Sequence, residues 1–222
     1  MNILWIIIFI IISLIILYFT WNENKYSKNG KFKLLELPNL LSPEEADQII
    51  QLAKQNGLSQ SYVVSDNKLD SYDDKFRKSD QTWMSRSHHP VLEKLSKISY
   101  ELTGLPQDNQ EMIQVVRYEK GGKFDAHFDP CVKSEDICNQ MNRGAGQRKT
   151  TLLIYLNDVM QGGETEFVNL RRKIKPEKGK GILFWSTDDD ENVYKESLHR
   201  GSEVVEGEKW IATIWSHPLK YN

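Results

Sequence analysis

Three side chains that bind metals well stand at spacings that would let them share one ion. His127 and Asp129 are two residues apart in a stretch that we expect to be a β-strand, and His199 stands in a later expected strand. Side chains at i and i+2 of a strand point to the same face. Two imidazoles and one carboxylate on one side of a metal leave half of an octahedral ion open, as in non-haem Fe(II) oxygenases. On its own, the short His-x-Asp pattern is also expected by chance.

The sequence around these residues is more specific than the triplet. Residues 118–124 precede His127, residues 197–201 surround His199, and residues 207–215 follow it. Further characteristic blocks are residues 114–118, 147–148, 151–156, 162–165 and 183–185. Because these blocks recur in order between about residues 111 and 217, the chain resembles the prolyl 4-hydroxylase family of 2-oxoglutarate/Fe(II) dioxygenases.

The resemblance implies a ligand set and a reaction. His127, Asp129 and His199 would hold Fe(2+), and the enzyme would hydroxylate peptidyl proline to 4-hydroxyproline with O₂ and 2-oxoglutarate, releasing succinate and CO₂. L-ascorbate is the expected reductant. Two alternatives remain. One is hydroxylation of another side chain or of a free amino acid, and the other is a non-catalytic, membrane-tethered peptide-binding module.

Lys209 stands ten residues after the last expected ligand. The resemblance implies that it binds the distal carboxylate of 2-oxoglutarate, with hydroxyls from Tyr118 and Thr151. The chemistry agrees, because a buried carboxylate requires a cation and further hydrogen bonds. An exposed strand lysine is the ordinary alternative, since lysine is rarely buried unpaired. Nucleic-acid demethylases and lysyl hydroxylases of the superfamily typically carry arginine at this position, so the lysine favours a prolyl hydroxylase.

Three residues are expected on the substrate side of the site. Phe124, Trp215 and Gln114 occupy positions that the resemblance places near the iron. Lys209 and Trp215 alternate onto one face of the expected strand 209–216, which we place inside the barrel. Core packing is an alternative explanation for the inward aromatic residues.

The pattern of hydrophobic residues favours a mainly β fold with flanking helices, and the resemblance implies a double-stranded β-helix (jelly roll). A dioxygenase domain is expected over residues 33–222, with its metal-binding core at 111–217. The charged segment 66–80 is expected to be a loop, either a mobile lid or simply solvated. Helices are expected at residues 43–56 and 90–102, and strands at residues 33–37, 61–64, 82–84, 112–118, 124–128, 150–156, 165–168, 181–185, 193–198 and 209–216.

The N-terminus predicts a membrane anchor. Ile3 to Trp21 are 19 residues without a charge, a length close to the roughly 30 Å thickness of a bilayer core. We therefore expect a transmembrane helix at residues 1–21 and a linker at 22–32. A cleaved signal peptide and a buried helix are the alternatives, but no basic segment precedes the run and no Ala-x-Ala-like site follows it.

The compartment of the domain is left open between two predictions. Four lysines between residues 25 and 33 follow the span, which favours a cytosolic domain by the positive-inside rule. The resemblance favours the lumen of the endoplasmic reticulum. Cys131 and Cys138 would form a disulfide there, stay reduced in cytosol, or belong to a small metal site. A net charge of −2 argues against nucleic acid as a partner, so the expected partners are a proline-containing peptide or protein and the membrane.

Overall fold

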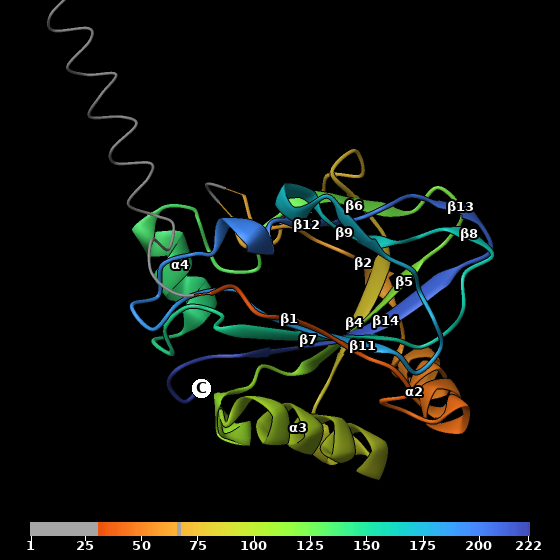
Figure 1. The fold of residues 1–222 in the computed structure, drawn as a ribbon, viewed down its shortest axis with the longest axis horizontal. Helices are drawn as coiled ribbons and strands as arrows, with labels where there is room; N and C mark the ends of the chain where they lie inside the picture. Colours follow the sequence, from red (N-terminus) through yellow and green to blue (C-terminus); the bar gives the residue numbers. More distant parts are fainter. Residues whose placement is uncertain (1–30, 66–67) are drawn as a thin grey trace, which may run out of the picture.

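Two β-sheets face each other across the interior of the domain (Figure 1). The computed structural model describes residues 31–65 and 68–222. The larger sheet has the strand order β1-β11-β7-β14-β5-β4-β2, the smaller has the order β10-β9-β12-β6-β3, and β13 pairs with β8. All the pairs in both sheets are antiparallel. The arrangement is the mainly β, double-sheet architecture with flanking helices that the sequence predicted.

The strands are β1 (Leu34–Leu37), β2 (Ser59–Gln60), β3 (Arg77–Lys78), β4 (Asp80–Met84), β5 (Ile113–Tyr118), β6 (Lys123–His127), β7 (Thr150–Tyr155), β8 (Gln161–Gly162), β9 (Thr165–Phe167), β10 (Arg172–Ile174), β11 (Gly181–Trp185), β12 (His199–Gly201), β13 (Val204–Glu206) and β14 (Lys209–Ser216). The α-helices are α2 (Pro43–Asn56), α3 (Pro90–Thr103) and α4 (Glu135–Asn142), and single 3-10 turns occur at Arg86–His88, Gln107–Asn109, Val168–Leu170 and Lys195–Ser197.

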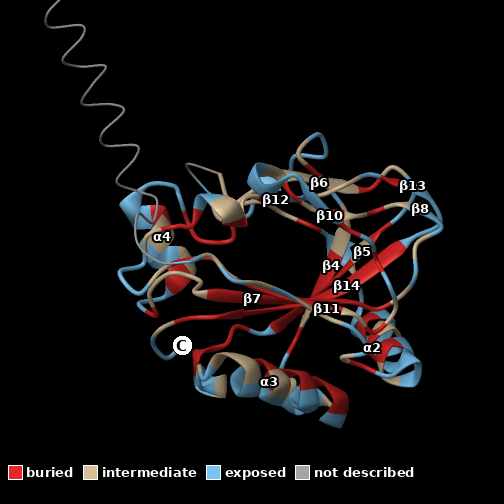
Figure 2. Cartoon of the chain, viewed as in Figure 1, coloured by how far each residue is buried: buried red, intermediate tan, exposed pale blue. Residues whose placement is uncertain are grey.

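The central strands are buried on both faces, as Figure 2 shows for β7, β11 and β14. On β14, Trp210, Ala212 and Ile214 pack against the helices, whereas Ile211 packs between the sheets with Tyr155 of β7. This alternation follows from the two-residue period of a strand. It leaves the odd-numbered face of β14, which begins with Lys209, inside the barrel as the sequence predicted.

Helices α2 and α3 cover the outer face of the larger sheet (Figure 1). Ser42 caps α2 and forms a capping box with Glu45, as expected for a Ser-Pro-Glu-Glu start. His89 caps α3 by accepting a hydrogen bond from the Val91 N–H. Gly104 ends α3 in the left-handed region (φ +73°). These caps fix both helices where the apolar periodicity predicted them.

Several predicted boundaries were wrong. Residues 193–198 form a β-bridge at Val193 and a 3-10 turn instead of a strand, and the ladder begins only at His199. The strand expected at 61–64 is displaced to Ser59–Gln60. The segment expected to be a loop at 66–80 contains β3, which pairs with β6. Helix α4 was not predicted, because it has only eight residues and few apolar positions.

The predicted membrane anchor at residues 3–21 lies outside the part of the chain that the structure describes. Within residues 31–65 and 68–222, no helix combines the length and the apolar character needed to cross a bilayer.

Candidate active site

The three predicted ligands converge between β6 and β12 of the smaller sheet. His127 ends β6, and His199 begins β12 directly opposite it in the antiparallel pair. Asp129 lies two residues beyond β6 and is buried. One ligand atom from each of the three lies within 4.8 Å of the others. Each histidine Nε2 is 3.9 Å from a carboxylate oxygen of Asp129, so the donors surround one point.

Hydrogen bonds on the far side of each ring fix the tautomers. Nδ1 of His127 lies 2.8 Å from the Asp125 carbonyl, and Nδ1 of His199 lies 2.9 Å from the Ser197 carbonyl. A carbonyl only accepts, so each Nδ1 carries the hydrogen and donates it. Each Nε2 therefore presents its lone pair to the centre, which is how supporting hydrogen bonds orient metal-binding histidines.

The protonation states also suit a metal. Burial, together with the neighbouring His199, lowers the pKa of His127 to about 3, so this imidazole is neutral at pH 7. Burial opposes ionisation of Asp129, but the two imidazoles and Arg148 outweigh it and lower its pKa. The Thr151 hydroxyl donates to Asp129 Oδ2 at 2.7 Å and adds to this effect. The site thus offers the neutral imidazole of His127, the carboxylate of Asp129 and the inward-facing Nε2 of His199.

Lys209 is the first residue of β14 and is only 2% exposed. The ammonium of Lys209 has no hydrogen bond or ion pair with any described residue. Its Nζ lies 5.4 Å from the centre of the Tyr118 ring and 5.6 Å from that of Tyr155. Burial lowers the pKa of Lys209 to about 7, and the charge of Glu164 partly opposes this. Lysine is rarely buried without a partner, so this one is available to an anionic ligand.

One cavity of about 40 Å³ contains both features. Its wall includes the three donors His127, Asp129 and His199, and it also includes Lys209, Tyr118 and Thr165. The two residues predicted to supply hydroxyls, Tyr118 and Thr151, both line this cavity, although Thr151 already donates its hydrogen to Asp129. Tyr118 stands directly opposite Lys209 in the pairing of β5 with β14.

A larger cavity of about 510 Å³ adjoins the small one and shares six lining residues with it. These are Arg77, Gln114, Phe124, His127, Asp129 and Trp215. We call the larger cavity the groove. Phe124 stacks on the His127 ring with centroids 3.6 Å apart, and Trp215 packs near Trp83 at 5.9 Å. The three residues predicted on the substrate side all lie at the junction.

Two arginines at the groove had no role in the sequence interpretation. Arg77 is 7% exposed, lies 4.5 Å from the centre of the Phe124 ring and donates to the Tyr62 carbonyl. The sequence did not indicate its position, because residues 66–80 have no hydrophobic periodicity from which a strand could be predicted. Arg148 forms two hydrogen bonds with buried Glu111 and lies 3.8 Å from the centre of the Trp215 ring. The block at 147–148 was noted in the sequence, but its partner Glu111, which lies just before β5, was not predictable from it.

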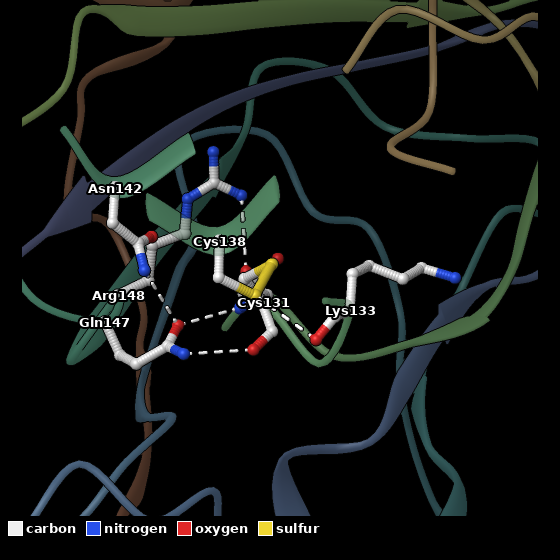
Figure 3. Close-up of a disulfide and its surroundings, with 7 residues drawn as sticks. Cys131, Lys133, Cys138, Asn142, Gln147 and Arg148 are labelled. Carbon is white, nitrogen blue, oxygen red and sulfur yellow. Dashed lines mark hydrogen bonds between the residues drawn. A yellow bond between two sulfur atoms is a disulfide. The ribbon is translucent and has the colours of Figure 1, made fainter. Parts of the chain in front are cut away.

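Cys131 and Cys138 form a disulfide beside the groove, with their Cα atoms 5.3 Å apart (Figure 3). Of the three possibilities left by the sequence, this is the one that the structure adopts. Cys131 lies two residues after Asp129 and lines the groove, and Cys138 belongs to α4. The disulfide therefore joins the loop that follows the candidate ligand Asp129 to helix α4.

The fold and the donor set define an oxygenase of the 2-oxoglutarate/Fe(II) type. A family model described as the 2OG-Fe(II) oxygenase superfamily matches residues 113–217. The collagen prolyl hydroxylase of Paramecium bursaria Chlorella virus-1, solved with 2-oxoglutarate, superposes with a TM-score of 0.67 at 34% identity, covering 84% of this chain and 96% of that one.

Curated relatives define the family more narrowly. A putative prolyl 4-hydroxylase of Acanthamoeba polyphaga mimivirus is 36% identical over 188 residues, covering 84% of this chain and 74% of the relative. The probable prolyl 4-hydroxylase 3 of Arabidopsis thaliana is 35% identical over 202 residues, covering 82% and 68%. The chain belongs to the prolyl 4-hydroxylase family, as its sequence blocks indicated.

Proposed function

We propose that this enzyme hydroxylates peptidyl proline to 4-hydroxyproline, using Fe(II), O₂ and 2-oxoglutarate and releasing succinate and CO₂. One observation carries the proposal: a cavity joins three converging metal donors to an unpaired buried lysine, and it adjoins an open groove. The relatives described above are named as prolyl hydroxylases, which supports proline as the target.

His127, Asp129 and His199 would hold the iron. The set fits a divalent ion because the His127 imidazole is neutral, the Asp129 carboxyl is ionised, and Nε2 of His199 faces the same point. When bound, Fe(II) supplies the activation of O₂ coupled to decarboxylation of 2-oxoglutarate. The chain orients its histidine donors through the Asp125 and Ser197 carbonyls, and it buries Asp129 and His199.

Lys209 would bind the distal carboxylate of 2-oxoglutarate. Its ammonium lacks a partner among the described residues, and an anion would remove the free-energy penalty of burying it. Tyr118 and Thr151 line the same cavity and offer hydroxyls for the remaining hydrogen bonds. In Thr151 this requires that its hydroxyl, which now donates to Asp129, turn and donate to the ligand instead.

The groove suits an extended proline-containing chain better than a small molecule. It has a volume of about 510 Å³, and its lining includes Phe124, Trp83 and Trp215. Proline has no backbone N–H and presents an apolar ring, so a proline-rich strand can pack its rings against this aromatic lining.

The deciding experiment measures succinate release and hydroxyproline formation from a panel of proline-containing peptides and free amino acids. We expect product only with peptides, and none with His199→Ala. Ascorbate should sustain turnover as the reductant. Hydroxylation of a free amino acid or of a residue other than proline would replace proline as the substrate while keeping the iron chemistry. Peptide binding without any turnover would instead favour a binding module.

We further propose that residues 1–21 anchor the enzyme in a membrane, with residues 22–32 as a linker and 33–222 as the catalytic domain. The support is the uncharged run from Ile3 to Trp21. The full-length protein should resist carbonate extraction, and a protein that begins at Asn22 should remain active without membrane. A mature N-terminus beyond residue 20 would identify a cleaved signal peptide instead.

We propose that the domain faces the lumen of the endoplasmic reticulum. The disulfide between Cys131 and Cys138 supports an oxidising compartment, because cytosolic thiols are kept reduced. The lysines after the anchor favour the opposite orientation. Thiol labelling of the protein from its native membrane, with and without reductant, decides the matter. Two free thiols in native material would place the domain in the cytosol.

A further inference from the structure

The side chain of Gln147 is bonded to the main chain of the loop that follows β6. Its Oε1 accepts from the Cys131 N–H at 2.8 Å, and its Nε2 donates to the Cys131 carbonyl at 3.0 Å (Figure 3). This reciprocal pair is the pattern that two residues exchange across an antiparallel ladder. Gln147 Oε1 also accepts from Asn142 at the end of α4. One carboxamide thus ties the start of the loop and the end of the helix together.

Gln147 is itself held in place. Its N–H donates to a carboxylate oxygen of Glu191. The preceding residue, Gly146, has φ +79°, and a Cβ there would meet Pro218 at 2.6 Å and Glu191 at 2.9 Å. The tight approach at Gly146 therefore fixes the direction from which Gln147 reaches Cys131. Because the backbone of Gln147 is already fixed, its side chain loses less conformational entropy when it bonds to Cys131.

The same short segment holds the neighbouring candidate ligand by other contacts. Arg148 Nη1 donates to the Asp129 carbonyl at 3.4 Å, and Thr151 donates to the Asp129 carboxylate at 2.7 Å. Residues 147, 148 and 151 therefore each bond to the segment 129–131. If the Gln147 carboxamide were removed, Asp129 would keep its bonds to Arg148 and Thr151, whereas Cys131 would lose both of its bonds to Gln147.

The loop that Gln147 holds is one wall of the groove. Residues 130–133 and Met141 of α4 all line it, and the disulfide joins Cys131 to α4 across the same wall. The small cavity around Lys209 has no lining residue from this loop beyond Asp129. A change in the loop should therefore alter binding of the peptide but not binding of 2-oxoglutarate.

We propose that Gln147 is a positioning residue for the peptide substrate, which fixes the groove wall at residues 130–133 by pairing with the Cys131 main chain. The inference rests on the proposed function, since it concerns the peptide of that reaction. It assigns to the carboxamide a role in KM for the peptide and none in the chemistry or in co-substrate binding.

The test compares Gln147→Met with Gln140→Met. Methionine keeps the length of the side chain but makes neither hydrogen bond, and Gln140 is an exposed glutamine of α4 that serves as the matched control. The probe is a Pro-Pro-Gly repeat peptide. With Gln147→Met we expect KM for the peptide to rise about tenfold, as does its Kd measured by tryptophan fluorescence in the anaerobic Fe(II)/2-oxoglutarate enzyme. KM for 2-oxoglutarate should stay within twofold, and Gln140→Met should match the wild type throughout.

Hydrogen exchange gives a readout that does not depend on activity. The Cys131 amide donates to Gln147, so its exchange should be at least tenfold faster in Gln147→Met and unchanged in Gln140→Met. Unchanged exchange, or a peptide KM within twofold of wild type, overturns the inference. An equal rise in both KM values also overturns it, because that would show a general loss of the site. Wild-type enzyme that neither binds nor hydroxylates the peptide would instead contradict the proposed function.

Discussion

The cavity around Lys209 and the groove beside it differ in how their charged side chains are paired. The cavity is about 40 Å³ and holds an ammonium with no partner among the described residues. The groove is about 510 Å³, and one of its arginines, Arg148, is bonded twice to Glu111, which also bonds His217. Strands β3, β5, β6 and β14 contribute to both walls, whereas the loop at 130–133 and α4 line only the groove.

The difference indicates two kinds of recognition. An unpaired buried cation destabilises the free enzyme and becomes favourable only when an anion arrives, so it selects one charged ligand strongly. A paired cation has little left to offer a ligand electrostatically. Arg148 instead holds Trp215 in place at 3.8 Å, and the groove presents fixed aromatic surfaces that tolerate varied peptides.

The largest effect should come from the donors that the two regions share. His199→Ala removes one of three proposed iron ligands from a preformed barrel, so turnover should be lost while the fold is retained. Iron content and circular dichroism of purified residues 22–222 check both parts, with one Fe(II) expected in the wild type. Wild-type hydroxylation by His199→Ala would contradict the assignment of the ligands.

Lys209→Ala should affect only the inner cavity. Removing one partner of a buried charge pair typically costs about 3–5 kcal/mol, which corresponds to about two to four orders of magnitude in affinity for 2-oxoglutarate. Peptide Kd should change little. Arginine should not restore the affinity fully, because its planar fork is larger than an ammonium. An unchanged KM for 2-oxoglutarate would contradict the pairing and remove the contrast between the regions.

The pH dependence of 2-oxoglutarate binding tests the same contrast more gently. Burial lowers the pKa of Lys209 to about 7, so the side chain of the free enzyme loses its proton as the pH rises through 7. The bound carboxylate favours the ammonium and raises this pKa, so binding above pH 7 must take up a proton. KM for 2-oxoglutarate should therefore increase from pH 6.5 to 8.5, by up to about tenfold per unit.

A matched variant isolates the lysine in that experiment. Lys209→Arg keeps its charge throughout this range, so its KM for 2-oxoglutarate should be weaker but flat with pH. A slope that persists in the arginine variant would assign the titration to another group. Peptide Kd should show no comparable slope, since the arginines of the groove remain charged.

The sequence predicted the inner cavity far better than the groove. Lys209, Tyr118, His127 and His199 lie on strands, where a two-residue period determines which side chains face inward, and Asp129 follows two residues after the end of β6. The groove depends on segments without such a period. Arg77 lies in a two-residue strand, and α4 is too short and polar to be recognised. The pairs Arg148–Glu111 and Gln147–Cys131 join residues 37 and 16 positions apart, and their contacts are set by tertiary packing.

The disulfide offers the smallest and most local change on the groove side. Cys131→Ser/Cys138→Ser opens a loop of about eight residues, and the chain-entropy estimate gives a loss of about 2.5 kcal/mol in stability. For a domain of this size the melting temperature should fall by about 5–10 °C. Wild-type enzyme in reductant should melt like the variant, and the variant should not respond to reductant. Because Gln147 still pairs with the main chain at residue 131, KM for 2-oxoglutarate should stay within twofold and peptide KM should rise only a few-fold. A larger change in 2-oxoglutarate binding would show that the groove wall and the inner cavity are structurally coupled.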